Sequence, residues 1–184
     1  MNIIPTPLEG VLIIEPDVYH DQRGFFFETY QKERYQALGI VQDFVQDNIS
    51  FSKKGTVRGL HFQITKPQAK LVQAITGEIF DVAVDIRPES ATFGKWTGII
   101  LSEENRRQFL IPEGFAHGFA VLSDTALFSY KCSNYYKADD EGGILFSDPF
   151  IGIEWPVQNP ILSGKDQKYP GLKDLEPEQL YLPG

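Results

Sequence analysis

Short strand-like segments separated by turn residues are the feature that most constrains the fold of this chain. Beyond residue 40 they recur roughly every ten residues. They lie at residues 43–51, 56–63, 69–75, 78–86, 95–101, 107–111, 116–122 and 125–131. Turn residues mark the breaks, as in Lys53-Lys54-Gly55, Thr76-Gly77 and Pro112-Glu113-Gly114. This pattern predicts an all-β protein, either an antiparallel sandwich or a barrel.

The two ends of the chain differ from this central region. Before it, residues 11–14 and 25–30 are predicted strands, and residues 31–38 form a predicted short helix that ends at a glycine. From about Asp148 onward Pro and Gly are frequent, and we expect this tail to wrap the strands with short helical turns. The length suits one domain, so residues 1–184 are predicted to form a single unit.

Composition and charge disfavour several classes of protein. A net charge of −8 argues against a nucleic-acid polymer as partner, because proteins that bind such polymers carry a basic surface. The apolar runs are too short to span a membrane. Cys132 is the only cysteine, so no intramolecular disulfide can form, and the first residues lack the basic start of a secretory signal. We therefore expect a cytoplasmic protein with no membrane partner.

One predicted strand contains a cation and a histidine among apolar residues. A lone histidine in such a place is usually a core side chain bonded to a backbone carbonyl. Here Arg58 and Lys70 indicate a polar lining, which favours a functional His61 that accepts protons near neutral pH. Arg58 and His61 are three positions apart and would point to opposite faces of a regular strand. A bulge at Gly59 would turn both to one side.

A second motif places another histidine after a sharp turn. The spacing of Pro112, Gly114 and His117 resembles the second half-motif of the cupin superfamily, in which a turn delivers a histidine into the mouth of a β-barrel. Metal-binding cupins carry His-x-His and a Glu in the first half-motif. This chain has His61-Phe62-Gln63 there, with Lys70 downstream. We therefore expect a cavity lined by His61, Lys70, His117 and Tyr130 that holds no metal and needs no cofactor.

Several longer segments together resemble the dTDP-4-dehydrorhamnose 3,5-epimerases, which are metal-free cupins of nucleotide-sugar metabolism. The resemblance extends from about Ile3 to Asp166. The matching segments are residues 21–26, 46–48, 57–63, 68–72, 77–87, 111–119 and 130–136. Membership of this family implies a cupin-type double-stranded β-helix, a jelly-roll barrel with short peripheral helices.

The resemblance also implies roles for catalytic residues. His61 corresponds to the base, Asp166 to the partner that orients it, and Tyr130 to the acid on the opposite face of the sugar. Lys70 and Arg58 correspond to the cations that face the developing oxyanion. For Tyr130 alone, the alternative is a strand tyrosine with its ring in the core and its hydroxyl at the rim.

Binding residues and an assembly follow from the same resemblance. Family members are homodimers in which an N-terminal segment reaches the neighbour, so Arg23 and Glu28 would serve the other subunit's cavity. Tyr136 corresponds to the ring that stacks on thymine. The remaining positions that contact the dTDP-sugar in the family are Gln46, Asp47, Asn48, His117, Glu141 and Lys165.

The predicted activity is epimerisation of dTDP-4-dehydro-6-deoxy-D-glucose at carbons 3 and 5, giving dTDP-4-dehydro-L-rhamnose. An epimerase of carbon 3 or carbon 5 alone is an alternative, because Gly164 stands where many relatives have an acid. A metal-dependent cupin oxygenase is a second alternative, and it would need at least three ligands in one pocket. A non-catalytic sugar-binding module is a third.

Overall fold

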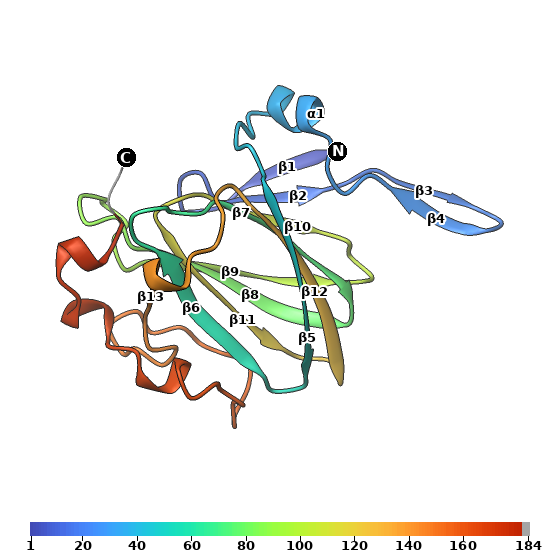
Figure 1. Ribbon diagram of the computed structural model, residues 1–184. Helices are drawn as coiled ribbons and strands as arrows, with labels where there is room; N and C mark the ends of the chain where they lie inside the picture. The colour runs from blue at the N-terminus through green and yellow to red at the C-terminus, as the bar shows by residue number, and fades with distance from the viewer. Residues whose placement is uncertain (182–184) are drawn as a thin grey trace.

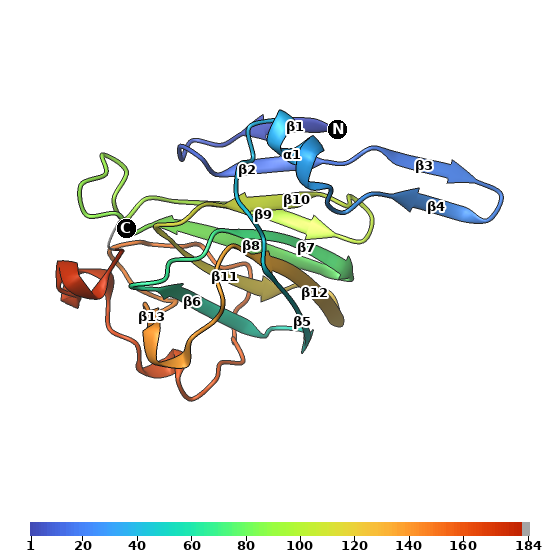
Figure 2. The ribbon, with the colours of Figure 1, turned by 45° about the horizontal axis from the view of Figure 1, so that its top comes forward.

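The computed structural model describes residues 1–181, and two packed antiparallel sheets make up the body of the chain (Figures 1 and 2). The six-stranded sheet contains, in spatial order, β1 (Asn2–Pro5), β2 (Leu12–Glu15), β10 (Gln108–Ile111), β7 (Lys70–Thr76), β12 (Thr125–Cys132) and β5 (Gln46–Lys53). The five-stranded sheet contains β13 (Glu141–Gly143), β6 (Val57–Gln63), β11 (Phe115–Val121), β8 (Glu78–Asp85) and β9 (Trp96–Ser102). The predicted all-β barrel of the jelly-roll type is confirmed.

The smaller elements lie outside these two sheets. The hairpin of β3 (Val18–Asp21) and β4 (Gly24–Phe27) projects away from the body as an arm (Figure 1). The helix α1 (Lys32–Ala37) agrees with the predicted helix to within one residue at each end. The short 3₁₀ helices are Ala138–Asp140, Asp166–Lys168, Leu172–Asp174 and Pro177–Gln179.

The sequence prediction missed three strands and placed the end of another three residues too late. None of the three has the alternation of apolar residues that signals a strand. β1 is Asn-Ile-Ile-Pro, β3 is Val-Tyr-His-Asp and β13 is Glu-Gly-Gly. The strand expected at 25–30 ends at Phe27. Its neighbour β3 supplies partners only from Val18 onward.

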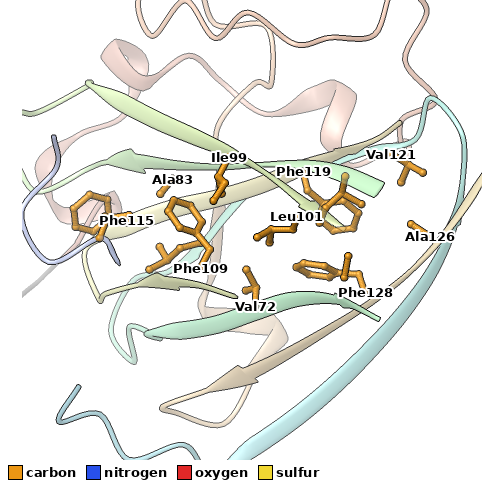
Figure 3. Packing of buried hydrophobic residues seen from close by; sticks show 14 of the residues in the cluster. Val72, Ala83, Ile99, Leu101, Phe109, Phe115, Phe119, Val121, Ala126 and Phe128 are labelled. Carbon is orange, nitrogen blue, oxygen red and sulfur yellow. The ribbon is translucent and has the colours of Figure 1, made fainter. Parts of the chain in front are cut away.

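Aromatic residues fill the space between the sheets. Phe109, Phe119 and Phe128 are at most 4% exposed and pack with smaller apolar side chains from both sheets (Figure 3). Burying each such side chain stabilises the fold by roughly 1.5–3 kcal/mol. This core fixes the separation of the two sheets that carry the polar residues of the cavity described below.

The C-terminal tail packs on the outer side of the five-stranded sheet. Ile151 and Leu172 of the tail belong to one buried apolar cluster with Val82 and Val84 of β8. The tail contains several of the short 3₁₀ helices, as predicted from its Pro and Gly content. The Asp166–Lys168 turn consequently lies against β6, close to His61.

A bulge in β6 turns two polar residues to the same side, as the spacing of Arg58 and His61 predicts. His61 lies opposite His117, and Arg58 lies opposite Phe119, so three steps along β6 match two along β11. Gly59, between them, has a φ of +119°, and a Cβ there would lie 2.5 Å from the Cα of Gly118. Only glycine fits this position.

Replacing Gly59 with alanine tests the bulge. We expect Gly59→Ala to lower the free energy of unfolding by about 2 kcal/mol or more, because the new methyl group meets backbone atoms at a strained φ. Gly164→Ala is the matched control, since a Cβ at Gly164 has open space around it and meets no atom within 4 Å. Urea denaturation at one protein concentration measures both variants. Equal stability of the two would contradict the bulge.

Candidate active site

A cavity of about 310 Å³ opens where β5, β6, β7, β12 and β13 meet. Three of the predicted catalytic residues, His61, Lys70 and Tyr130, line it. Its walls are formed by Gln46, Asn48, His61, Phe62, Gln63, Gln68, Lys70, Tyr130, Cys132, Tyr136, Glu141 and Lys165. The lining is therefore polar and comes from both sheets of the barrel.

Asp166 anchors the imidazole of His61. Its Oδ1 lies 2.7 Å from Nε2 of His61, and the Asp166 side chain is only 3% exposed. Burial by itself raises the pKa of this carboxyl, but hydrogen bonds from His61, Ser163 and the backbone of Gly59 outweigh burial and hold the pKa below its usual range. Asp166 is thus a carboxylate. It fixes the proton of His61 on Nε2 and leaves Nδ1 able to accept one.

Glu141 accepts hydrogen bonds from three side chains at the cavity. Its Oε1 accepts from Lys165 Nζ at 2.6 Å and from the Tyr169 hydroxyl at 3.3 Å, and its Oε2 accepts from the Tyr136 hydroxyl at 2.6 Å. Burial raises the pKa of Glu141, but Lys165 and Tyr136 lower it below the usual range. The predicted binding residues Tyr136, Glu141 and Lys165 therefore form one bonded cluster. Oε1 of Glu141 lies 4.0 Å from Nε2 of His61.

Lys70 and Tyr130 lie side by side on neighbouring strands of the six-stranded sheet. Tyr130 pairs with Val72, two positions from Lys70. Burial lowers the pKa of Lys70 and raises that of Tyr130, so the tyrosine keeps its proton well into the alkaline range. Within residues 1–181, Lys70 forms no ion pair. A partly buried lysine that forms no ion pair makes this wall attractive to an anion.

His117 does not line the cavity, contrary to the prediction. Its Nε2 lies 3.0 Å from both carboxylate oxygens of Asp81, and its ring stacks on Phe128 in the core. Burial is the main cause that raises the pKa of Asp81 and lowers the pKa of His117. Asp81 acts to raise the pKa of Lys70, against the larger effect of burial.

The other predicted residues fall into two groups. Gln46 and Asn48 line the cavity and are bonded to each other at 3.0 Å. The second group lies outside the lining and has partners elsewhere: Arg58 with Ser52, Asp47 with Lys131, Arg23 with Asp21, and Glu28 with Arg34. Arg58 is exposed, but its charge acts to lower the pKa of the Tyr130 hydroxyl, against the larger effect of burial.

Tyr169 lies beside His61, and sequence reasoning missed it. Its ring packs edge-on against the imidazole of His61, with ring centroids 5.8 Å apart. Only its closeness in sequence to Asp166 could have drawn attention to it.

In residues 1–181, no group of three or more His, Cys, Asp or Glu side chains is arranged to hold a metal ion. The helices of this part of the chain are all too short or too polar to cross a membrane.

Comparison with known proteins gives the family. A sequence model described as dTDP-4-dehydrorhamnose 3,5-epimerase matches residues 5–174. The chain belongs to this family. A curated dTDP-4-dehydrorhamnose 3,5-epimerase from Shigella flexneri is 59% identical, with 90% of this chain and 93% of the relative covered. A counterpart from Methanothermobacter thermautotrophicus is 53% identical, with 94% and 95% covered.

A solved structure extends the similarity to the fold. The crystal structure of a dTDP-6-deoxy-D-glucose-3,5-epimerase from Legionella pneumophila, in complex with dTDP-4-keto-L-rhamnose, is 52% identical. It superposes with a TM-score of 0.95 and covers 98% of this chain and 97% of its own. The curated relatives are epimerases, and this chain is an enzyme of the same kind.

The buried charge of Lys70 leads to a prediction about stability. Lys70→Met should raise the free energy of unfolding at pH 7 by about 1 kcal/mol or more, because it removes a desolvated charge without a counter-ion. A lysine with a lowered pKa in the folded state penalises folding most at low pH. The advantage of Lys70→Met should therefore shrink as the pH rises towards the ordinary lysine pKa of about 10.5.

Urea denaturation from pH 6 to 10 measures this difference, with Lys95→Met as the control, since Lys95 is exposed. The control should change stability little at any pH. A Lys70→Met protein that is less stable at pH 7 would show that the cation is compensated in the folded chain.

Proposed function

We propose that this chain inverts carbons 3 and 5 of dTDP-4-dehydro-6-deoxy-D-glucose to give dTDP-4-dehydro-L-rhamnose, without a metal or organic cofactor. The observation that carries the proposal is the arrangement of three groups around one cavity. An oriented imidazole, a protonated phenol and a partly buried lysine that forms no ion pair line it. Removal of a proton next to a ketone needs a base, an acid and a stabiliser of negative charge.

Each inversion proceeds in two proton transfers. His61 takes the proton from the carbon next to the C4 ketone, and the electron pair of that C–H bond moves onto the ketone oxygen as an enolate. Lys70 stabilises the enolate oxygen, and Arg58 adds positive charge to the same interior. Tyr130 then gives its proton to the opposite face of the carbon, which inverts it. Asp166 stabilises the imidazolium that forms on His61.

The nucleotide part of the substrate fits the remaining polar wall. We propose that Gln46, Asn48 and Lys165 bind the dTDP portion, and that the ring of Tyr136 stacks on thymine. Tyr136 is half exposed at the cavity wall, as a stacking ring needs to be. Asp47 and His117 have bonded partners away from the cavity, so their predicted contact with substrate would require rearrangement.

Hydrogen exchange separates the two proton carriers. In heavy water, His61→Asn should lose both deuterium uptake into substrate and inverted product, by at least roughly 100-fold, because it has no base. Tyr130→Phe should still take up deuterium, since His61 can form the enolate and return a deuteron to its own side. Its inverted product should fall sharply. NMR of the sugar measures uptake and configuration at both carbons, and also identifies an enzyme that inverts only one.

The control is Tyr135→Phe, because Tyr135 is 68% exposed and lies outside the cavity lining. It should behave like the unmodified protein. Normal inversion by Tyr130→Phe would exclude Tyr130 as the acid. Normal deuterium uptake by His61→Asn would exclude His61 as the base.

We also propose that the chain forms a homodimer in the cytoplasm. The arm exposes Phe26 and Tyr19 at 70% and 63%, and the outer face of β5 exposes Ile49 and Phe51 at 69% and 59%. Apolar surfaces of this kind favour a protein partner. A second copy of the chain would bring the arm, with Arg23, to a neighbouring cavity. The lone buried Cys132 is compatible with a reducing compartment.

Mixing inactive variants tests whether Arg23 acts in the neighbour's cavity. His61→Asn and Arg23→Ala should each have low activity alone. A mixed dimer contains one complete cavity, with His61 from the Arg23→Ala chain and Arg23 from its partner, so mixing should restore activity. The control mixture of His61→Asn with Tyr130→Phe should stay inactive, because both residues belong to the same cavity of one chain. No recovery in the first mixture would place Arg23 in its own subunit's site.

A further inference from the structure

Tyr169 lies directly against the proposed base, although the proposed chemistry gives it no task. We propose that Tyr169 is a positioning residue whose ring, seated on Gly143, holds the imidazole of His61 in the orientation that proton abstraction requires. This inference rests on the proposed role of His61 as the base. It adds two residues, Tyr169 and Gly143, to the machinery of the reaction.

The ring of Tyr169 supplies a restraint that Asp166 cannot. The carboxylate of Asp166 holds one atom of the imidazole, Nε2, at 2.7 Å, which leaves the ring plane free to swing about that atom. Tyr169 meets the imidazole edge to face, with an angle of 68° between the ring planes. Contact with the ring and a hydrogen bond to its edge together fix its direction. A base needs this precision, because small misplacement of reacting atoms lowers the rate steeply.

Gly143 provides the seat for the Tyr169 ring. In the pairing of β13 with β6, Gly143 lies opposite His61. A Cβ at Gly143 would lie 2.2–2.4 Å from three ring atoms of Tyr169, so the ring occupies the space that any side chain would need. The ring therefore lies on bare backbone next to the base. This explains a glycine at a position where φ is not in the left-handed region.

Two hydrogen bonds hold Tyr169 and the residue after it in place. Its hydroxyl donates to Oε1 of Glu141 at 3.3 Å, the same oxygen that Lys165 contacts. The next residue, Pro170, accepts a backbone hydrogen bond from Leu145 at 2.9 Å. The Pro170 contact belongs to the backbone and survives a change of the Tyr169 side chain. The ring can thus be altered without detaching the segment.

Tyr169 lies outside the residues that line the cavity, so a positioning role predicts a particular kinetic pattern. Tyr169→Leu should lower kcat by roughly tenfold or more and leave KM nearly unchanged. Tyr169→Phe keeps the ring and should retain most of kcat. Gly143→Ala pushes the ring off its seat and should lower kcat in the same way. The double variant Gly143→Ala/Tyr169→Leu should be no worse than the poorer single variant, because both changes remove one restraint.

The experiment measures kcat and KM for these variants on dTDP-4-dehydro-6-deoxy-D-glucose. Tyr135→Phe is the control that should keep normal values, and His61→Asn is the inactive reference. Near-UV circular dichroism checks the fold, and if Gly143→Ala does not fold, the comparison of Tyr169→Leu with Tyr169→Phe decides. Unchanged kcat in Tyr169→Leu while His61→Asn is inactive would overturn this inference and leave the base in place. Equal losses in the Phe and Leu variants would also overturn it, since the hydroxyl would then be responsible. An active His61→Asn would instead overturn the proposed function.

Discussion

The bulge at Gly59 is the constraint on which the site depends. A regular β6 would turn Arg58 and His61 to opposite faces, so the imidazole in the cavity and the cation that acts on Tyr130 could not share one side of the strand. The extra residue matches three positions of β6 to two of β11. It can form because Gly59 and Gly118 let the two backbones approach closely. A local distortion of one strand thus decides where the chemistry of the molecule can occur.

Charges at this end of the barrel are arranged at a cost to stability. Asp166 and Glu141 are ionised because donors surround them. Lys70 is different, since it is partly buried, its pKa is lowered by desolvation, and it has no ion pair within residues 1–181. Buried charges are usually paired, and an unpaired one persists where a ligand supplies the missing charge. In the proposed reaction the developing enolate does so, and only then is Lys70 fully compensated.

The sequence predicts the parts of this molecule that follow from local pattern. The strands from β5 to β12 and the helix α1 appear near their expected places because apolar alternation and turn residues mark them. Strand β13 has no such signal. Its two glycines pair with β6, and the rings of Phe62 and Tyr169 occupy the space that side chains would need there. His117 was misplaced because Asp81, 36 positions away in sequence, holds it in the core. Contacts between distant segments carry no signal in a single sequence.

The two-sheet architecture itself suits an epimerase. His61 stands on β6 of the five-stranded sheet, and Tyr130 stands on β12 of the six-stranded sheet, yet both line one cavity. In the proposed reaction, a sugar held between them would present one face to each sheet. Two proton carriers on one sheet would remove and return the proton on one side, which restores the original configuration. Because the apolar core fixes the distance between the sheets, packing far from the cavity also sets the separation of His61, the proposed base, and Tyr130, the proposed acid.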